Sequence, residues 1–306
     1  MNNSETRRVP PWIWHVLRLA GIPFVIYVIM KVDWNEVLLM YRRLGLATTL
    51  AMVAALFVVL LVKVRRWFDL LRYQGVPRSG WEVFLSYTEA YFHGFITPAR
   101  LGEVYRLRHL TQWGLDTKRA AGNLIVERGM DVAFLASLGL FSLGLYSTYP
   151  HWIGAVYGLI VVLLASSGGL LVLRRFPSLR SWIARTDGSH GSRLLIITCL
   201  GLTIASWAIM FAIVYVVRGF LGIDMGPVMT LFSFVLSTAI VAIPVSVAGF
   251  GTKELALIHF LGVWGYEPEQ AVAFSLIFAV IYVLNLLFSG LIWFAILAHQ
   301  HVQRPE

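Results

Sequence analysis

Charged and polar residues recur at helical spacing inside an otherwise apolar stretch of the chain. Asn123, Glu127 and Asp131 are four residues apart, which places them on one face of a helix. Ionisable groups inside an apolar helix are costly unless they pair with one another or face a water-filled cavity. Two interpretations follow: the carboxylates line a polar cavity, or Glu127 pairs with Arg100 or Arg106 and holds a loop.

A second group of charges follows a break in a short apolar helix, in the stretch 81–110. The helix has about 15 residues, too few to cross a hydrocarbon core of ~30 Å. Pro98 ends it, and Gly102 permits a tight turn or a close backbone approach. Arg100 and Arg106 offer forked donors that suit a phosphate. The alternative is that both arginines lie at the membrane interface and extend to water.

The stretch 227–260 repeats this organisation in the second half of the chain. After its apolar helix, the helix breakers and a charged pair come in this order: Pro244, Gly249, Gly251, Lys253 and Glu254. Two hydrophobic segments interrupted by Pro and Gly at matching places in two halves indicate a binding site near the middle of the membrane in a transporter.

Glu89 and His93 lie four residues apart on the first short helix and face the same way. A carboxylate beside an imidazole can relay protons, although such a pair is also a common satisfied polar contact. The histidines have no spacing that favours a metal site, and Cys199 is the single cysteine. We expect no metal, no cofactor and no enzymatic activity, since no catalytic motif is recognisable.

The composition is that of a membrane protein. Of 306 residues, 58% are hydrophobic and 13% are charged, whereas a soluble domain has roughly 25% charged residues. We therefore predict an all-α polytopic membrane protein with one transmembrane domain over residues 1–306. The six predicted transmembrane helices are 12–30, 46–64, 120–146, 152–173, 194–217 and 271–298.

The distribution of Lys and Arg predicts the orientation in the membrane. The loops after the second and fourth spans are basic, so they and both tails (1–11 and 299–306) should be cytoplasmic. The two interrupted segments then enter from opposite faces as inverted re-entrant segments. The net charge of +9 lies in short loops between spans, which indicates contact with lipid head groups rather than nucleic acid.

One loop fits this orientation poorly. The connection after the first span is expected to be a mixed loop outside the cell, yet it holds Lys31, Arg42 and Arg43. Basic residues are normally enriched on the cytoplasmic side.

Three sequence runs together resemble a known family: ITPARLGEVYRLRHL, VERGMDVAFL and IPVSVAGFGTKELAL. Their order and spacing are similar to the flippase-like membrane domain of the lysylphosphatidylglycerol synthase family, from the first span to Ala298. The resemblance implies a domain that moves a phospholipid or lipid-linked head group between leaflets. The soluble aminoacyltransferase domain of larger relatives has no counterpart, so that activity is not expected. The positions matching the family motifs are Pro98, Arg100, Gly102, Glu103, Arg106, Glu127, Arg128, Asp131, Pro244, Gly249, Gly251, Lys253 and Glu254.

The leading hypothesis is a lipid transporter of the inner membrane. Its substrate would be an anionic phospholipid, an aminoacylated phospholipid or a polyprenyl-phosphate-linked lipid. The bases expected to hold the head group are Arg100, Arg106, Arg128 and Lys253. The acids expected to position these bases, or to accept a cationic group or a proton, are Glu103, Glu127, Asp131 and Glu254.

Two other functions stay open. One is an integral-membrane enzyme or accessory subunit that acts on a lipid-linked sugar or a phospholipid. The other is a scaffold for a lipid-modifying synthase partner. A homodimer is compatible with the small residues in the spans.

Overall fold

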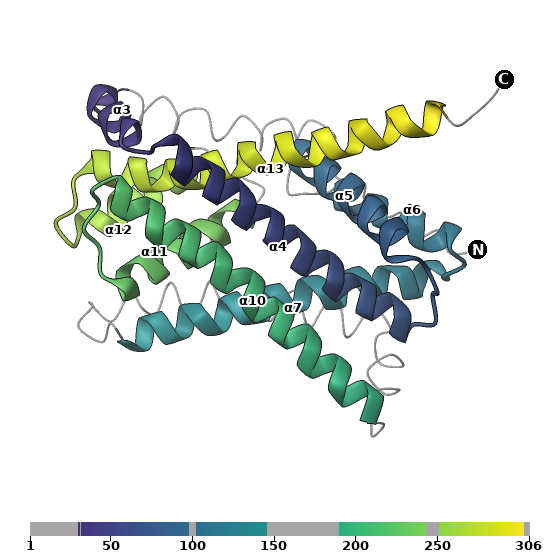
Figure 1. Cartoon of the computed structure of the whole chain (residues 1–306). Coiled ribbons are helices and arrows are strands. Elements are labelled where there is room, and N and C mark those ends of the chain that lie inside the picture. Colours follow the sequence, from purple (N-terminus) through teal and green to yellow (C-terminus); the bar gives the residue numbers. More distant parts are fainter. Residues whose placement is uncertain (1–29, 31, 98–101, 146–189, 243–250, 303–306) are drawn as a thin grey trace, which may run out of the picture.

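The computed structural model describes residues 30, 32–97, 102–145, 190–242 and 251–302, and all regular structure within these ranges is helical (Figure 1). The helices are α3 (Trp34–Arg42), α4 (Leu46–Tyr73), α5 (Gly80–Ile96), α6 (Tyr105–Gln112), α7 (Thr117–Leu145), α10 (His190–Phe220), α11 (Pro227–Ala242), α12 (Thr252–Gly262) and α13 (Pro268–Val302). The prediction of an all-α membrane protein is confirmed.

Long apolar helices form the frame of the molecule. Among the described helices, α4, α10 and α13 are long and apolar enough to cross a membrane. The 29 residues of α7 extend about 44 Å at 1.5 Å per residue, but this helix carries the charged residues described below. These four helices correspond to four of the predicted spans. The predicted spans 12–30 and 152–173 lie outside the described residues, apart from Met30 at the edge of the first.

The helix α4 extends beyond the predicted end of its span at residue 64 and continues to Tyr73. Its buried face runs through Leu56, Val59, Lys63 and Trp67 at helical spacing. The prediction that the basic residues directly after 64 form a loop is therefore wrong, because residues 65–73 are helical. The apolar stripe continues in register through the charged stretch, so packing extends the helix.

The connection expected as a mixed loop forms the helix α3 instead, which corrects that prediction. The carboxylate of Asp33 caps the helix by accepting from the amide of Asn35 (2.9 Å). The hydroxyl of Tyr41 donates to the carbonyl of Ala273 on α13 (2.9 Å). A capped first turn and one buried face suffice to make this mixed-polarity segment helical.

Each broken segment forms a hairpin that begins and ends at the same end of the bundle. In the first, the Arg78 guanidinium before α5 lies 5.6 Å from the Trp113 ring centroid after α6. In the second, the Tyr266 hydroxyl after α12 donates to the carbonyl of Asp224 before α11 (2.9 Å). The two hairpins lie at opposite ends of the molecule (Figure 1).

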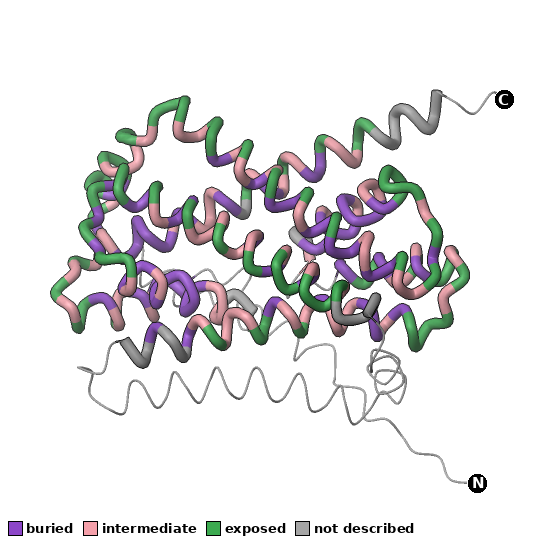
Figure 2. Tube along the Cα trace, turned by 60° about the horizontal axis from the view of Figure 1, so that its bottom comes forward, coloured by how far each residue is buried: buried purple, intermediate pink, exposed green. Residues whose placement is uncertain are grey.

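The helix α13 packs against both hairpins, contacting α5 and α12. Buried residues lie where the helices face one another, and exposed residues lie on the outer sides (Figure 2). Many of the exposed side chains on the long helices are large and apolar, including Leu194, Ile197, Leu291 and Phe294. Apolar outer faces on long helices are expected of helices that contact lipid.

Candidate functional site

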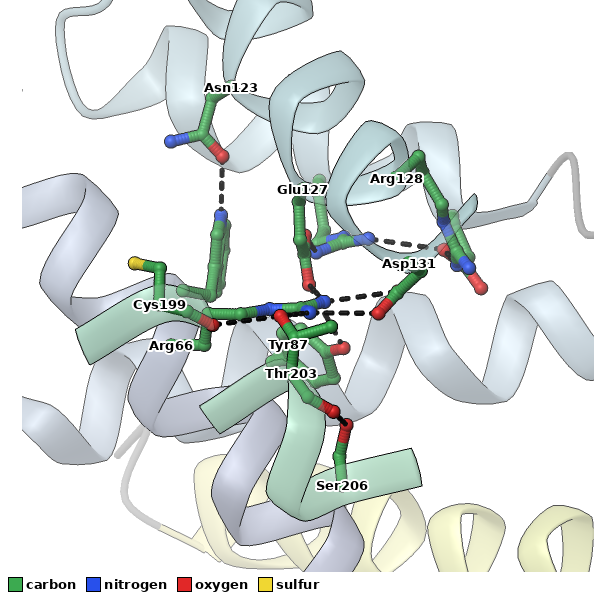
Figure 3. Close-up of polar contacts among 12 residues, drawn as sticks. Arg66, Tyr87, Asn123, Glu127, Arg128, Asp131, Cys199, Thr203 and Ser206 are labelled. Atoms are coloured by element: carbon green, nitrogen blue, oxygen red, sulfur yellow. Dashed lines mark hydrogen bonds and ion pairs between the residues drawn. The ribbon is translucent and has the colours of Figure 1, made fainter. Parts of the chain in front are cut away.

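The polar residues of α7 share one buried face, as their spacing predicts. Asn123, Glu127 and Asp131 are all buried, and their side chains point toward α4 and α10 (Figure 3). Asp131 lies fourteen residues from either end of α7. The network of ion pairs described next therefore reaches the middle of this long helix. We call Arg66, Glu103, Arg106, Glu127, Arg128 and Asp131 the charged network.

Arg66 of α4 is the most enclosed member of the charged network. Its guanidinium donates to both carboxylate oxygens of Asp131 (2.8 and 3.1 Å), to Glu127 (3.2 Å) and to the Thr203 hydroxyl (2.7 Å). Trp207 donates its indole N–H to the same Asp131 carboxylate (3.1 Å). Donors on α4 and α10 thus satisfy the Asp131 carboxylate. A buried carboxylate requires such hydrogen-bond partners.

Sequence reasoning missed Arg66 as a site residue. Its position could have identified it. Arg66 is three residues after Lys63 and directly precedes Trp67, so it lies on the buried face of α4. Lys63 is buried too, and its ammonium group lies 5.4 Å from the centroid of the Trp207 ring. Arg66 follows the second predicted span (46–64), in a stretch expected to be a basic loop, where it would have been solvated.

Arg106 of α6 links the first hairpin to α7. Its guanidinium forms an ion pair with Glu127 and donates to Glu103 (3.1 Å). It also lies 4.8 Å from the Tyr87 ring centroid and 5.4 Å from that of Trp67. The structure thus has the ion pair between Glu127 and Arg106 that was one of the two interpretations of this sequence pattern.

Arg128 differs from the other two arginines of the charged network in its accessibility. It forms an ion pair with Glu103, yet 41% of its side chain is exposed. The corresponding value is 1% for Arg66 and 3% for Arg106. Three guanidinium groups face three carboxylates, so the formal charges of the network balance. Arg128 is the member that a ligand can approach.

Gly102 lies where a side chain would not fit, directly beyond the end of α5. A Cβ at this position would overlap the carbonyl group of His93. The Thr97 hydroxyl donates to the same carbonyl (2.8 Å) and accepts from the Gly102 amide (2.6 Å). The close backbone approach predicted for this glycine is confirmed. Pro98 and Arg100 lie outside the described residues.

The structure does not pair the side chains of Glu89 and His93 as a relay would require. The Glu89 carboxylate pairs with the imidazole Nε2 of His109 on α6 (2.9 Å). His93 directs its Nδ1 to the main-chain carbonyl of Glu89 (2.8 Å), and its ring stacks on Tyr105 (4.3 Å between centroids). The alternative, a satisfied polar contact, describes His93 better. The partner of the Glu89 carboxylate is on the other arm of the hairpin.

The second broken segment has its own buried charged pair. Gly251, with φ of +80°, precedes α12 and donates its amide to Glu254 (2.7 Å). Ser275 of α13 also donates to this carboxylate. The ammonium group of Lys253 lies 3.6 Å from Glu254 and 5.4 Å from the Phe278 ring centroid. Pro244 and Gly249 lie outside the described residues.

The described part of the chain holds no group of three or more His, Cys, Asp or Glu side chains arranged to bind a metal ion. All acids of the charged network instead face guanidinium groups.

Comparison with known proteins decides the family. The family model for the transmembrane region of lysylphosphatidylglycerol synthase matches residues 13–290. The chain belongs to this family. It is also similar to the UPF0104 membrane protein MJ1078 of Methanocaldococcus jannaschii, with 25% identity over 231 residues that cover 70% of this chain and 98% of that protein.

The family assignment confirms the resemblance inferred from the three sequence runs. The region that matches the lysylphosphatidylglycerol synthase transmembrane model includes both broken segments and every residue of the charged network. Membership supports an integral membrane protein with a function related to lipids.

Proposed function

We propose that this protein moves a lipid with an anionic head group between the leaflets of the inner membrane. The observation that carries the proposal is the pair of hairpins at opposite ends of the bundle, each with buried charges at its tip. The 11 residues of α12 extend about 16 Å, which is half of a ~30 Å hydrocarbon core. The first hairpin returns over a similar length from Gly102 to Gln112.

These lengths support two re-entrant segments whose tips reach the middle of the membrane from opposite faces. Interrupted helices in such inverted pairs hold the substrate of many transporters. The lipid tails would remain in the bilayer during transport, so only the head group needs a polar path.

The end of the bundle with the first hairpin is the proposed cytoplasmic face. It carries exposed basic residues on α4 and α7: Arg65, Arg72, Lys118 and Arg119. An excess of Lys and Arg is typical of cytoplasmic loops. Both termini are proposed to be on this side.

The arginines of the charged network divide into two roles in this proposal. Arg66 and Arg106 hold α4, α6 and α7 together from buried positions. Arg128 meets the head group, because it combines accessibility with a carboxylate partner that a phosphate can replace. Guanidinium groups bind phosphate through paired charge-assisted hydrogen bonds. Arg100 and Lys253 are proposed to contribute from the two hairpin tips.

Lipid movement by the purified protein in liposomes tests this proposal. The substrates are phospholipids labelled in the head group and a polyprenyl phosphate, with and without imposed proton or sodium gradients. The Arg128→Gln variant should lose movement, while Arg119→Gln, an exposed base on the same helix, should retain it. Full activity in Arg128→Gln would refute the head-group role, and no movement by the unmodified protein under any gradient would refute transport.

A further inference from the structure

A mainly apolar cavity, partly open to the surface, lies between α3, α4, α10 and α13, at the opposite end of the molecule from the charged network. Its volume is about 210 Å³. The apolar side chains of its wall are Leu44, Met52, Val217, Ile277 and Val280. An apolar cavity of about 150 Å³ in another protein stays dry and binds benzene. This cavity therefore has room for part of a hydrocarbon chain.

The polar side chains in the wall are engaged with the main chain. The Tyr41 hydroxyl donates to the carbonyl of Ala273 (2.9 Å), and the Thr49 hydroxyl donates to that of Gly45 (3.2 Å). Their protons are thus directed to the protein and not into the cavity. A hydrocarbon occupant loses no hydrogen bond on entering such a space, whereas a polar occupant would.

Two exposed arginines lie between wall residues in the sequence. Arg42 and Arg43 separate Tyr41 from Leu44, and both are exposed. A guanidinium nitrogen of Arg43 lies against Gly222 in the turn after α10. The acidic residues Asp33 and Glu36 are at the other end of α3, away from this arginine pair.

We infer that this cavity and the arginine pair form a binding site for an anionic phospholipid, with an acyl chain in the cavity and the phosphate on Arg42 and Arg43. Charge complementarity selects the head group, and the apolar side chains of the wall select the tail. The site lies outside the proposed transport path, and its existence does not depend on transport. It accounts for basic residues in a connection that the charge rule places outside the cell.

Native mass spectrometry of the full chain in detergent tests the site with phosphatidylglycerol and phosphatidylcholine of identical acyl chains. The double variant Arg42→Gln, Arg43→Gln should weaken phosphatidylglycerol binding by about 10- to 30-fold, at about 1 kcal/mol for each base, and leave phosphatidylcholine binding unchanged. The matched control is Lys118→Gln, Arg119→Gln, two exposed bases at the opposite end.

A second variant, Val280→Trp, tests the tail site by filling the cavity, and a melting curve establishes that it is folded. It should weaken binding of both lipids. Equal phosphatidylglycerol binding by the arginine double variant and its control would overturn the head-group assignment. Unchanged binding by folded Val280→Trp would overturn the tail assignment. A chain that binds phosphatidylglycerol but moves no lipid would support this site while refuting transport.

Discussion

The guanidinium of Arg66 forms a forked pair of hydrogen bonds with Asp131, at 2.8 and 3.1 Å, across 65 residues of sequence. The pair joins α4 to the central residue of α7, and the same guanidinium reaches Glu127 and Thr203. Both side chains are buried, so solvent cannot replace either partner if the other is removed.

The substitution Arg66→Gln should lower the free energy of unfolding by about 3–5 kcal/mol, since it leaves two carboxylates in the interior without their shared base. Thermal unfolding of the purified protein in detergent measures this loss. The adjacent Arg65 is the matched control, because 61% of its side chain is exposed and its partner Asp69 is on the same helix. Arg65→Gln should change stability by at most about 1 kcal/mol. Similar losses in the two variants would show that burial of Arg66 has no such consequence.

Gly102→Ala should destabilise the first hairpin by about 1–3 kcal/mol, because its Cβ would overlap the main chain at the end of α5. Gly129 on α7 is the control, since a Cβ there meets nothing within 4 Å. Gly129→Ala should leave stability unchanged or raise it by up to about 1 kcal/mol through helix propensity. Hydrogen exchange of the α5 and α6 amides reports the effect locally. Equal protection in both variants would contradict the close approach.

Arg106→Gln and Arg128→Gln should separate stability from transport. Arg106 is buried between two carboxylates and two aromatic rings, so its loss should cost about 3–5 kcal/mol. Arg128 is partly exposed, so Arg128→Gln should lower the free energy of unfolding by at most about 1 kcal/mol. Lipid movement should nevertheless be lost in this variant. Melting temperature and transport are measured on the same preparations. A folded and inactive Arg106→Gln with a severely unfolded Arg128→Gln would reverse the assigned roles.

The start of α5 should respond to pH through Glu82. The amide and hydroxyl of Ser79 hold the pKa of this exposed carboxyl below its ordinary value. A lowered pKa in the folded state means that the contribution to stability is present above the unfolded pKa of about 4.3. It is lost as the pH falls through the lower folded value. The protection factors of the amides at residues 80–83, which compare each exchange rate with that of the unfolded chain at the same pH, should therefore fall at acidic pH.

The capping-box residue Ser79 gives an independent test of the same cap. Ser79→Ala removes the hydroxyl that accepts from the Glu82 amide (3.2 Å) and should cost about 1 kcal/mol. In this variant the acid-induced fall in protection should be smaller, because part of the stabilisation of the carboxylate is already gone. An unchanged pH response would exclude the Ser79 hydroxyl as its cause.

Local sequence chemistry predicted the breaks in both hairpins and the buried face of α7. Pro98 and Gly102 act through the backbone next to them, and the spacing of Glu127 and Asp131 determines their common face without reference to other helices. The predicted breaks were therefore correct where the described residues test them: α5 ends at Ile96, and α12 begins after Gly251.

Contacts between distant segments account for what the sequence did not predict. Arg66 resembled a loop residue because its partners are on α7 and α10, far away in the sequence. Glu89 was paired with His93 on its own helix, whereas its partner His109 is on the returning arm. Helical spacing identifies neighbours within one helix only. Which histidine pairs with Glu89 depends on how the two arms of the hairpin pack.

One helix contacts the tips of both hairpins, and this has a mechanical consequence. Ser275 on α13 donates to Glu254 at the start of α12, while further along the same helix Asn285 accepts from Tyr91 (3.2 Å) and Trp293 stacks on Phe92 of α5. A shift of either hairpin against α13 changes the surface available to the other. In the proposed transport cycle, α13 would therefore couple the two hairpins, so that a movement of one alters the packing of the other.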